Sequence, residues 1–186
     1  MDQLIWKTVR IFKKTLLILY YPKLNSNSNI KEVNAIMKVL IIFDTKHGNT
    51  QKVAELIADG INSVESNETE VKNVKDIDLN EDKAYDLLLI GSPNHAKSHV
   101  KSIKKFINNL PNSQLKFNSF AVFDTYMGKD FEKAAKKMEK QINEKLPDST
   151  TALPGLSIKV GGMKGPIVEE DLSKCKEYGI KLVKKE

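Results

Sequence analysis

The chain has 186 residues, of which 40% are hydrophobic, and its nine glycines and six prolines are too few for a fibrous or wholly disordered protein. This length accommodates one domain with a substantial core. The single cysteine, Cys175, excludes an internal disulfide and a metal site built from several cysteines. We therefore expect a reducing compartment and predict a cytoplasmic protein.

The formal net charge of +6 is unevenly distributed along the chain. Six basic and two acidic residues give the first 36 residues a charge of +4, which leaves +2 for residues 37–186. In this larger part lysines are interspersed with acidic residues along the predicted helices, without a basic stripe that alternates with aromatic residues. This pattern is typical of solvated helix faces, so nucleic acid is not an expected partner.

The first 36 residues are predicted to lie outside the domain as a basic leader and linker. Their apolar run, 15-TLLILYYP-22, is far shorter than the roughly 20 residues that span a bilayer, and no small-residue cleavage site follows it. Three interpretations remain open: a basic amphipathic helix on a membrane surface, which is not favoured, a helix that packs on a partner, or an unstructured leader. Residues 24–34 are rich in serine and asparagine and are interpreted as a linker. We expect residues 1–36 to be dispensable for the chemistry.

From residue 37 onward, strand and helix patterns alternate. Five strands are predicted, three of them apolar enough to be buried on both faces (39–43, 85–91 and 119–123) and two shorter (69–74 and 156–160). Four helices are predicted from apolar residues at helical spacing, over 50–63, 99–110, 130–146 and 169–184. Phe131 is expected on the buried face of the third helix. The alternation predicts a doubly wound parallel α/β sheet.

In such a sheet the ligand binds beyond the carboxyl ends of the strands, where the winding reverses. Three loops leave the most apolar strands at that edge: 44-DTKHGNT-50, 91-GSPNHAKSH-99 and 124-DTYMGKD-130. All three are rich in polar groups and poor in bulky side chains. We therefore expect them to converge on one ligand.

The first loop has the chemistry of a phosphate site. Unpaired N–H groups at the start of the following helix carry the positive end of its dipole, and Thr45, Asn49 and Thr50 add neutral donors. Gly48 allows the backbone to approach the ligand closely. The loop lacks both the GxxxxGK[ST] spacing of nucleotide triphosphatases and the GxGxxG of dinucleotide folds. A single phosphate monoester, held mostly by neutral donors, is the remaining fit.

These segments resemble the flavodoxin family of small FMN-binding proteins. The resemblance rests on TKHGNT, GSPNHAKSHVKSIKKFINNL and FAVFDTYMG in this order, with LPGLSIKVGGMKGPIVEEDL behind them, and it covers residues 37–186. It implies a five-stranded parallel sheet in the order 2-1-3-4-5. It also implies bound FMN and one- or two-electron transfer between redox partner proteins.

The resemblance also assigns the contacts to FMN. The first loop would bind the phosphate through Thr45, Lys46, His47, Gly48, Asn49 and Thr50. The second loop would run along one side of the isoalloxazine through Ser92, Pro93, Asn94 and His95. The third loop would lie along the other side and the pyrimidine edge through Asp124, Thr125, Tyr126, Met127 and Gly128. Because the flavin supplies the redox chemistry, no catalytic residue is expected, and His95 and His99 lack the third ligand of a metal site.

The chain departs from the family pattern at several positions. His47 stands where the family usually has threonine, and His95, Ala96 and Lys97 occupy a stretch where many relatives have a glycine pair. The only tryptophan precedes residue 37, so His95 and Tyr126 are the planar groups available to the flavin. Typical flavodoxins are strongly acidic and dock on basic partners, whereas residues 37–186 are near neutral. The choice of partner therefore does not carry over from the family.

Alternatives remain open for single residues and for the function. Tyr126 suits a packed aromatic at the rim of a site as well as a flavin contact. Asp44 and Asp124 both suit strand-end turns, and Asp124 is favoured as a ligand contact. The alternative functions are an FMN-dependent oxidoreductase of the quinone reductase or protoporphyrinogen oxidase type, and a flavin-free signalling or scaffold domain. Residues 128–156 leave no room for an insertion that covers a substrate, which favours the electron carrier.

Overall fold

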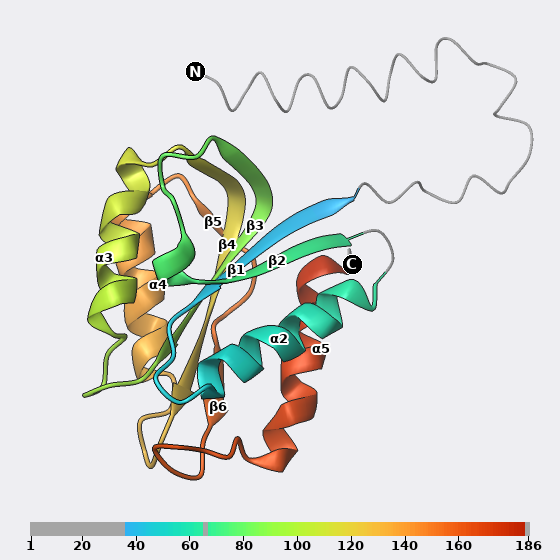
Figure 1. Cartoon of the computed structure of the whole chain (residues 1–186), viewed down its shortest axis with the longest axis vertical. Coiled ribbons are helices and arrows are strands. Elements are labelled where there is room, and N and C mark those ends of the chain that lie inside the picture. Colours follow the sequence, from blue (N-terminus) through green and yellow to red (C-terminus); the bar gives the residue numbers. More distant parts are fainter. Residues whose placement is uncertain (1–35, 65–66, 185–186) are drawn as a thin grey trace, which may run out of the picture. The chain divides into compact units, whose positions relative to one another are not determined.

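A computed structural model describes residues 36–64 and 67–184 (Figure 1). The leader and linker expected over 1–36 lie outside this described part, except for Ile36. The described part is an α/β structure in which helices cover both faces of one parallel sheet. Within it, no helix combines the length and apolar character needed to cross a membrane.

The sheet has the order β2-β1-β3-β4-β5, with β6 also paired to β4. Every pairing between these strands is parallel. The strands are β1 (Met37–Phe43), β2 (Asn67–Asn73), β3 (Lys83–Pro93), β4 (Leu115–Tyr126), β5 (Thr150–Thr151) and β6 (Leu156–Lys159). This arrangement confirms the doubly wound sheet and the order 2-1-3-4-5 predicted from the sequence.

The edge beside β4 consists of two short strands where the sequence predicts one. β5 pairs with Ser119 and Phe120, and β6 pairs with the end of β4 from Phe123 to Tyr126. Gly155 lies between them, and its N–H donates to Glu139 Oε1 at 2.7 Å. A Cβ at Gly155 would lie 2.8 Å from Cγ2 of Val122, so the chain passes too close to the sheet for a side chain at this position.

The helices agree with the predicted ones to within three residues at each end. They are α2 (Asn49–Asn62), α3 (Lys101–Asn109), α4 (Lys133–Lys145) and α5 (Leu172–Val183), with short 3₁₀ turns at Val74–Asp76, Leu110–Asn112 and Glu169–Asp171. The prediction for Phe131 is wrong, because this side chain is 54% exposed. Glu132 adopts a left-handed conformation, with φ of 58°, so α4 begins only at Lys133 and Phe131 is not on its buried face.

Two hydrophobic cores lie on the two sides of the sheet. One packs α2 and α5 against the sheet, and the other packs α3 and α4 against the opposite face. Central strand residues such as Ile41 and Leu88 are fully buried, which contributes about 1.5–3 kcal/mol per side chain. Helices α2 and α5 approach closely through Gly60 and Gly179, where a Cβ would lie 2.2 Å from a carbonyl oxygen of the other helix.

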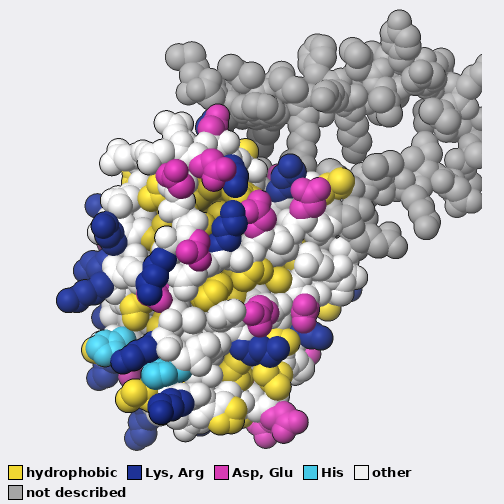
Figure 2. All heavy atoms as spheres, viewed as in Figure 1, with side chains coloured by type: hydrophobic (Ala, Val, Ile, Leu, Met, Phe, Trp, Pro, Cys, Tyr) yellow, Lys and Arg dark blue, Asp and Glu magenta, His cyan; other side chains and the backbone are white. Residues whose placement is uncertain are grey.

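The parallel strands bring their carboxyl ends to one edge of the sheet. The loops that follow β1, β3, β4 and β6 therefore meet at this edge, which is the lower end of the molecule in Figure 1. Lysine and histidine side chains gather at the same end in Figure 2. The predicted site residues all belong to three of these loops or to the residues that adjoin them.

Candidate functional site

The loop after β1 leads directly into α2 through Gly48. Gly48 has a φ of 85°, and a Cβ there would meet no heavy atom within 4 Å, so glycine is needed for the backbone conformation and not for space. The N–H of Gly48 donates to Thr45 Oγ1 at 2.9 Å. No side chain caps the start of α2, so the N–H groups of its first turn are available to a ligand. This donor set, at the positive end of a 14-residue helix, favours an anion.

The six residues predicted to bind the phosphate differ in their exposure. Lys46, His47 and Gly48 are exposed, whereas Thr45 and Asn49 are half-buried. Thr50 is 1% exposed, and its hydroxyl forms a hydrogen bond of 3.0 Å with the hydroxyl of Thr125. The side chain of Thr50 thus joins two loops of the site, while its backbone belongs to the uncapped helix start.

The second loop is closed by its own polar side chains. The hydroxyl of Ser92, which is fully buried, accepts the N–H of Val100 at 3.0 Å and donates to the carbonyl of Pro93 at 2.9 Å. The N–H of Asn94 donates to the carbonyl of Thr125 at 2.8 Å. Its Nδ2 donates to the carbonyl of Asp130 at 3.0 Å. These bonds fix the second loop against the third.

The remaining polar atom of Asn94 is an unsatisfied acceptor. Its Oδ1 is buried and has no hydrogen-bond partner among the described residues. A buried oxygen without a donor is costly, and such an atom beside a ligand site commonly accepts an N–H of the ligand. The sequence does not predict that this atom lacks a partner, because that depends on how the second and third loops lie in the folded chain.

Residues 95–98 form a tight two-residue turn. The backbone N–H of His95 donates to the carbonyl of Ser98 at 2.8 Å, and the reverse bond measures 3.1 Å. Ala96 and Lys97, the two central residues, have φ of 50° and 62°. Glycine and asparagine normally occupy such positions, so both residues are strained. The chain thus has the backbone conformation expected for a glycine pair without the glycines, and His95 is exposed at its start.

Asp124, at the start of the third predicted loop, is fully buried within the protein. Its Oδ2 accepts the N–H groups of Ala134 at 3.1 Å and Ala135 at 2.9 Å, and its Oδ1 accepts the hydroxyl of Ser157 at 2.5 Å. Burial raises the pKa of this carboxyl, although these three hydrogen bonds oppose the shift. Both oxygens are engaged by α4 and β6, so the side chain fixes the start of α4, and a ligand contact of Asp124 stays a prediction.

The end of the third loop is open and partly apolar. Tyr126 is half-buried, and its ring packs edge-on against Phe131 with centroids 5.6 Å apart and planes at 71°. Met127 is 44% exposed. Gly128 has a φ of 63°, and a Cβ there would have no neighbour within 4 Å. Phe131 thus packs against the ring of Tyr126. A contact between Tyr126 and a flavin stays a prediction.

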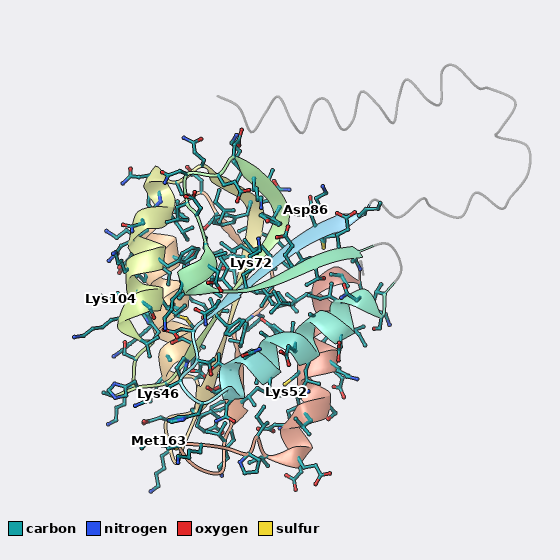
Figure 3. All side chains as sticks on the ribbon, viewed as in Figure 1. Lys46, Lys52, Lys72, Asp86, Lys104 and Met163 are labelled. Carbon is teal, nitrogen blue, oxygen red and sulfur yellow. The ribbon has the colours of Figure 1, made fainter. Side chains whose placement is uncertain are left out.

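A fourth loop reaches the site, although no site residue is predicted from it. Residues 161–166 form a narrow turn between Val160 and Ile167, which pair across it. Gly165 has a φ of 93°, and a Cβ there would lie 2.5 Å from Oδ1 of Asn49. Met163 of this loop lies at the same end of the molecule as Lys46 (Figure 3). Three glycines in 161-GGMKGP-166 are the signal in the sequence that could have indicated a close backbone approach.

Two other polar residues at this edge are held within the protein. A carboxylate oxygen of Asp44 accepts the hydroxyl of Ser102. His99 is buried, and its Nε2 lies 2.7 Å from Oε1 of Gln141. No cluster of three or more histidine, cysteine, aspartate or glutamate residues suited to a metal ion occurs in the described part of the chain.

The arrangement fits a phosphate monoester with an attached planar group. The uncapped helix start and Gly48 supply neutral donors for the phosphate, and the adjoining second and third loops supply His95, Tyr126 and the free acceptor Asn94 Oδ1. A family model described as Flavodoxin matches residues 41–177. The chain belongs to the flavodoxin family. This membership supports a flavodoxin-like electron carrier with a flavin cofactor.

Individual proteins and solved structures are also similar to the chain. A flavodoxin of Aquifex aeolicus (strain VF5) is 37% identical over 73 residues, which are 39% of this chain and 40% of that protein. An uncharacterized protein of Methanocaldococcus jannaschii is 27% identical over 161 residues, covering 80% of this chain and 99% of that protein. The solved structure of a flavodoxin from the domain Archaea is 26% identical, with a TM-score of 0.64 over 79% of this chain and 96% of that one.

Proposed function

We propose that the chain binds FMN at the carboxyl edge of its sheet and carries electrons between redox partner proteins. The main support for this proposal is the start of α2, which no side chain caps and which follows Gly48 with its φ of 85°. The N–H groups there are available to an anion. Neutral donors suit a phosphate monoester, which the phosphate end of FMN provides. Family membership supports the flavin, and the loop chemistry supports FMN over a flavin without phosphate.

Each loop has a distinct part in the proposed site. The backbone N–H groups of Asn49 and Thr50 would bind the phosphate, and the exposed side chains of Lys46 and His47 would add donors at its outer side. The second and third loops would orient the ring, with Asn94 Oδ1 as an acceptor for a ring N–H. Buried strand ends below these loops would exclude water from one side of the cofactor.

FMN, when bound, supplies one- or two-electron redox chemistry. The protein then needs neither a nucleophile nor an acid–base pair of its own. The segment between α4 and β6 contains only a turn and the two residues of β5, so it adds no cover under which a substrate would be enclosed. This supports an electron carrier over a quinone reductase or protoporphyrinogen oxidase. The single buried cysteine supports a cytoplasmic location.

The proposal is tested by titrating the purified chain with FMN and with riboflavin, which lacks the phosphate, while following flavin fluorescence. We expect FMN to bind at least about 100-fold more tightly than riboflavin, because several charge-assisted hydrogen bonds to the phosphate contribute about 1.5–3 kcal/mol each. A well-folded chain that binds neither compound, or binds both equally, would contradict the phosphate site.

Two glycine variants separate the phosphate loop from the ring loops. Gly48→Ala and Gly128→Ala both place a Cβ in open space at a positive φ, so each strains only the backbone of its own loop. We expect Gly48→Ala to weaken FMN binding about ten-fold while leaving riboflavin binding nearly unchanged. Gly128→Ala should weaken the binding of both flavins by similar factors. If Gly48→Ala weakened the binding of FMN and riboflavin equally, the first loop would not be the phosphate site.

A further inference from the structure

The loops around the proposed cofactor site carry a set of lysines without acidic partners. Each of four loops at the carboxyl edge presents one exposed lysine, and we call this set the lysine rim: Lys46, Lys97, Lys129 and Lys164. None of the four forms a salt bridge with a residue that the structure describes. Some lysines elsewhere are paired, as in Lys72 with Glu70 at 2.7 Å and Lys83 with Glu81 at 3.0 Å, and others are unpaired like those of the rim. The rim therefore presents uncompensated positive charge.

Acidic residues on the same loops neutralise the rim only in part. Asp44 is bound by Ser102, and Asp124 is buried against α4. Glu132 forms a salt bridge of 2.7 Å with Lys136. Among the acids of the three predicted loops, only the carboxylate of Asp130 forms no hydrogen bond or salt bridge with a described residue. The hydrogen bond from Ser102 leaves the charge of Asp44 in place, so the four loops carry four exposed lysines against Asp44 and Asp130, and Glu169 and Glu170 follow the fourth loop as exposed acids. The loops themselves therefore keep an excess of positive charge.

Exposed apolar side chains lie on these same loops. Among the described residues four large hydrophobic side chains are exposed, and three of them, Met127, Phe131 and Met163, belong to loops at this edge, with exposures of 44%, 54% and 68%. Methionine and aromatic side chains among charged neighbours are typical of the centre of a protein interface, where a polar rim surrounds apolar contacts. The fourth, Ile36, precedes β1 at the opposite edge.

The opposite edge of the sheet carries acidic residues together with paired lysines. The segment before β3 contains Asp76, Asp78, Glu81 and Asp82, of which Glu81 and Asp82 form salt bridges with Lys83 and Lys116. Figure 2 shows acidic side chains at the upper end of the molecule, with lysines among them, and a smaller acidic group at the lower end. The domain is close to neutral in total, and its excess of unpaired lysines lies on the four loops at the carboxyl edge. A local excess of one charge orients an approaching partner of the opposite charge and increases its rate of association.

We propose that the lysine rim and its three apolar side chains dock an acidic redox protein, with the apolar centre against the partner's electron-accepting group. This deepens the proposed function and rests on it. The sign of charge is opposite to that of typical flavodoxins. Residues 37–186 contain no arginine, the residue most used to contact nucleic acids. The apolar side chains lie on separate loops and not on one amphipathic helix of the kind that lies on membrane surfaces.

The test uses two haem proteins of opposite charge as electron acceptors: a soluble acidic cytochrome b5 and a basic cytochrome c. FMN-loaded chain is reduced anaerobically with light and EDTA, which is oxidised as the flavin gains its electrons, and is then mixed with each acceptor. One electron passes from the reduced flavin to one ferric haem, which becomes ferrous, and any proton that the flavin loses goes to water. Raising the ionic strength from about 10 to 300 mM should slow the reaction with cytochrome b5 at least about ten-fold and should not slow that with cytochrome c.

Matched variants locate the charge that is responsible. The rim variant carries Lys97→Asn, Lys129→Gln and Lys164→Gln, with asparagine at 97 because that residue has a positive φ. The control carries Lys75→Gln, Lys105→Gln and Lys145→Gln, which remove three exposed lysines that form no salt bridge in the described part of the chain. At low salt the rim variant should react with cytochrome b5 about five- to ten-fold more slowly, and the control within about two-fold of the unmodified chain.

Three results would overturn the docking proposal. The first is a reaction with cytochrome b5 that salt does not slow, and the second is equal slowing of that reaction in the two triple variants. The third is that the rim variant loses binding to phosphatidylserine vesicles or duplex DNA but reacts with cytochrome b5 as fast as the unmodified chain. Flavin absorbance, measured first on every variant, reports the proposed function separately. If the chain binds no FMN, amide chemical-shift mapping with cytochrome b5 decides the docking proposal. Shifts confined to the four loops support it, and their absence refutes it.

Discussion

The hydroxyl of Thr50 lies 3.0 Å from the hydroxyl of Thr125, which is 75 residues away in the chain. The two side chains are 1% and 4% exposed, so neither hydroxyl has access to solvent as a substitute partner. Thr50 belongs to the first turn of α2, and Thr125 lies near the end of β4. One buried hydrogen bond thus joins the proposed phosphate loop to the loop that would hold the ring.

Thr50→Val should destabilise the protein by about 1–3 kcal/mol, because it leaves the buried hydroxyl of Thr125 without a partner. Valine has nearly the same shape as threonine, so the packing should change little. The free energy of unfolding in urea measures the effect. The double variant Thr50→Val with Thr125→Val should be more stable than Thr50→Val alone, since both hydroxyls are then gone. Strict additivity of the two single changes would show that the hydroxyls are not coupled.

Gly165→Ala should weaken FMN binding more than riboflavin binding. The new Cβ would lie 2.5 Å from Asn49 Oδ1, at a residue whose φ of 93° already disfavours alanine. Asn49 must then move, and it starts the helix whose N–H groups would bind the phosphate. Flavin titrations measure both affinities. Gly161→Ala serves as the control, because the nearest heavy atom to its new Cβ would be 3.6 Å away. If the affinities fell equally in the two variants, the clash with Asn49 would not be the cause.

Ala96→Gly and Lys97→Gly should each stabilise the protein, although glycine usually destabilises. Both residues have a positive φ, and relief of this strain exceeds the entropy that glycine adds to the unfolded chain. The expected gain is about 0.5–1 kcal/mol for each change, measured by urea unfolding. Ala84→Gly, at an exposed position of β3, should instead cost about 0.5–1 kcal/mol. A loss of stability in all three variants would mean that residues 96 and 97 are not strained.

Stability should decrease as the pH falls below about 6.5, because His99 resists protonation in the folded state. Burial lowers its pKa from 6.5, the positive charges of Lys104 and Lys137 lower it further, and a hydrogen bond to Gln141 opposes the shift. Below pH 6.5 the unfolded chain gains a proton that the folded chain does not. Stability is therefore retained above this pH and lost as the pH falls toward the folded pKa, by at most about 1.4 kcal/mol per pH unit.

Urea unfolding at several pH values between about 5 and 7.5 checks this prediction. His99→Gln should flatten the curve, because glutamine does not titrate. Lys104→Gln should flatten it partly, whereas Lys105→Gln, at a neighbouring residue that does not contribute to the shift, should leave the slope unchanged. An unmodified chain and a His99→Gln variant with parallel pH profiles would rule out His99 as the cause.

The central part of the fold could be predicted because β1, β3 and β4 are buried on both faces. Continuous apolar runs have few other structural interpretations when helical patterns alternate with them. β5 could not be predicted, because Thr150 and Thr151 are exposed and the pairing depends on a distant strand, where Ala152 N–H donates to the Phe120 carbonyl at 2.8 Å. Phe131 was misplaced because helical spacing gave no sign that Glu132 interrupts the helix.

The three loops of the site could be predicted from their position after apolar strands, but the orientations of their polar side chains could not. Ser92 and Asp124 are buried by partners such as Val100 and Ser157, which lie 8 and 33 residues away. Sequence alone does not show which polar groups find partners in the folded chain. Gly165 and Asn49 are even further apart in the sequence, so nothing in the sequence connects the fourth loop with the first.

The close packing of α2 on α5 has a consequence for synthesis of the protein. Gly60 and Gly179 allow the two helices to touch, so the last helix of the chain supports the helix whose start would bind the phosphate. A ribosome completes α2 long before it has made α5, and until then part of the buried face of α2 lacks its cover. We expect nascent chains that stop before Leu172 to retain FMN poorly, so cofactor loading would wait until α5 has been made and has packed on α2.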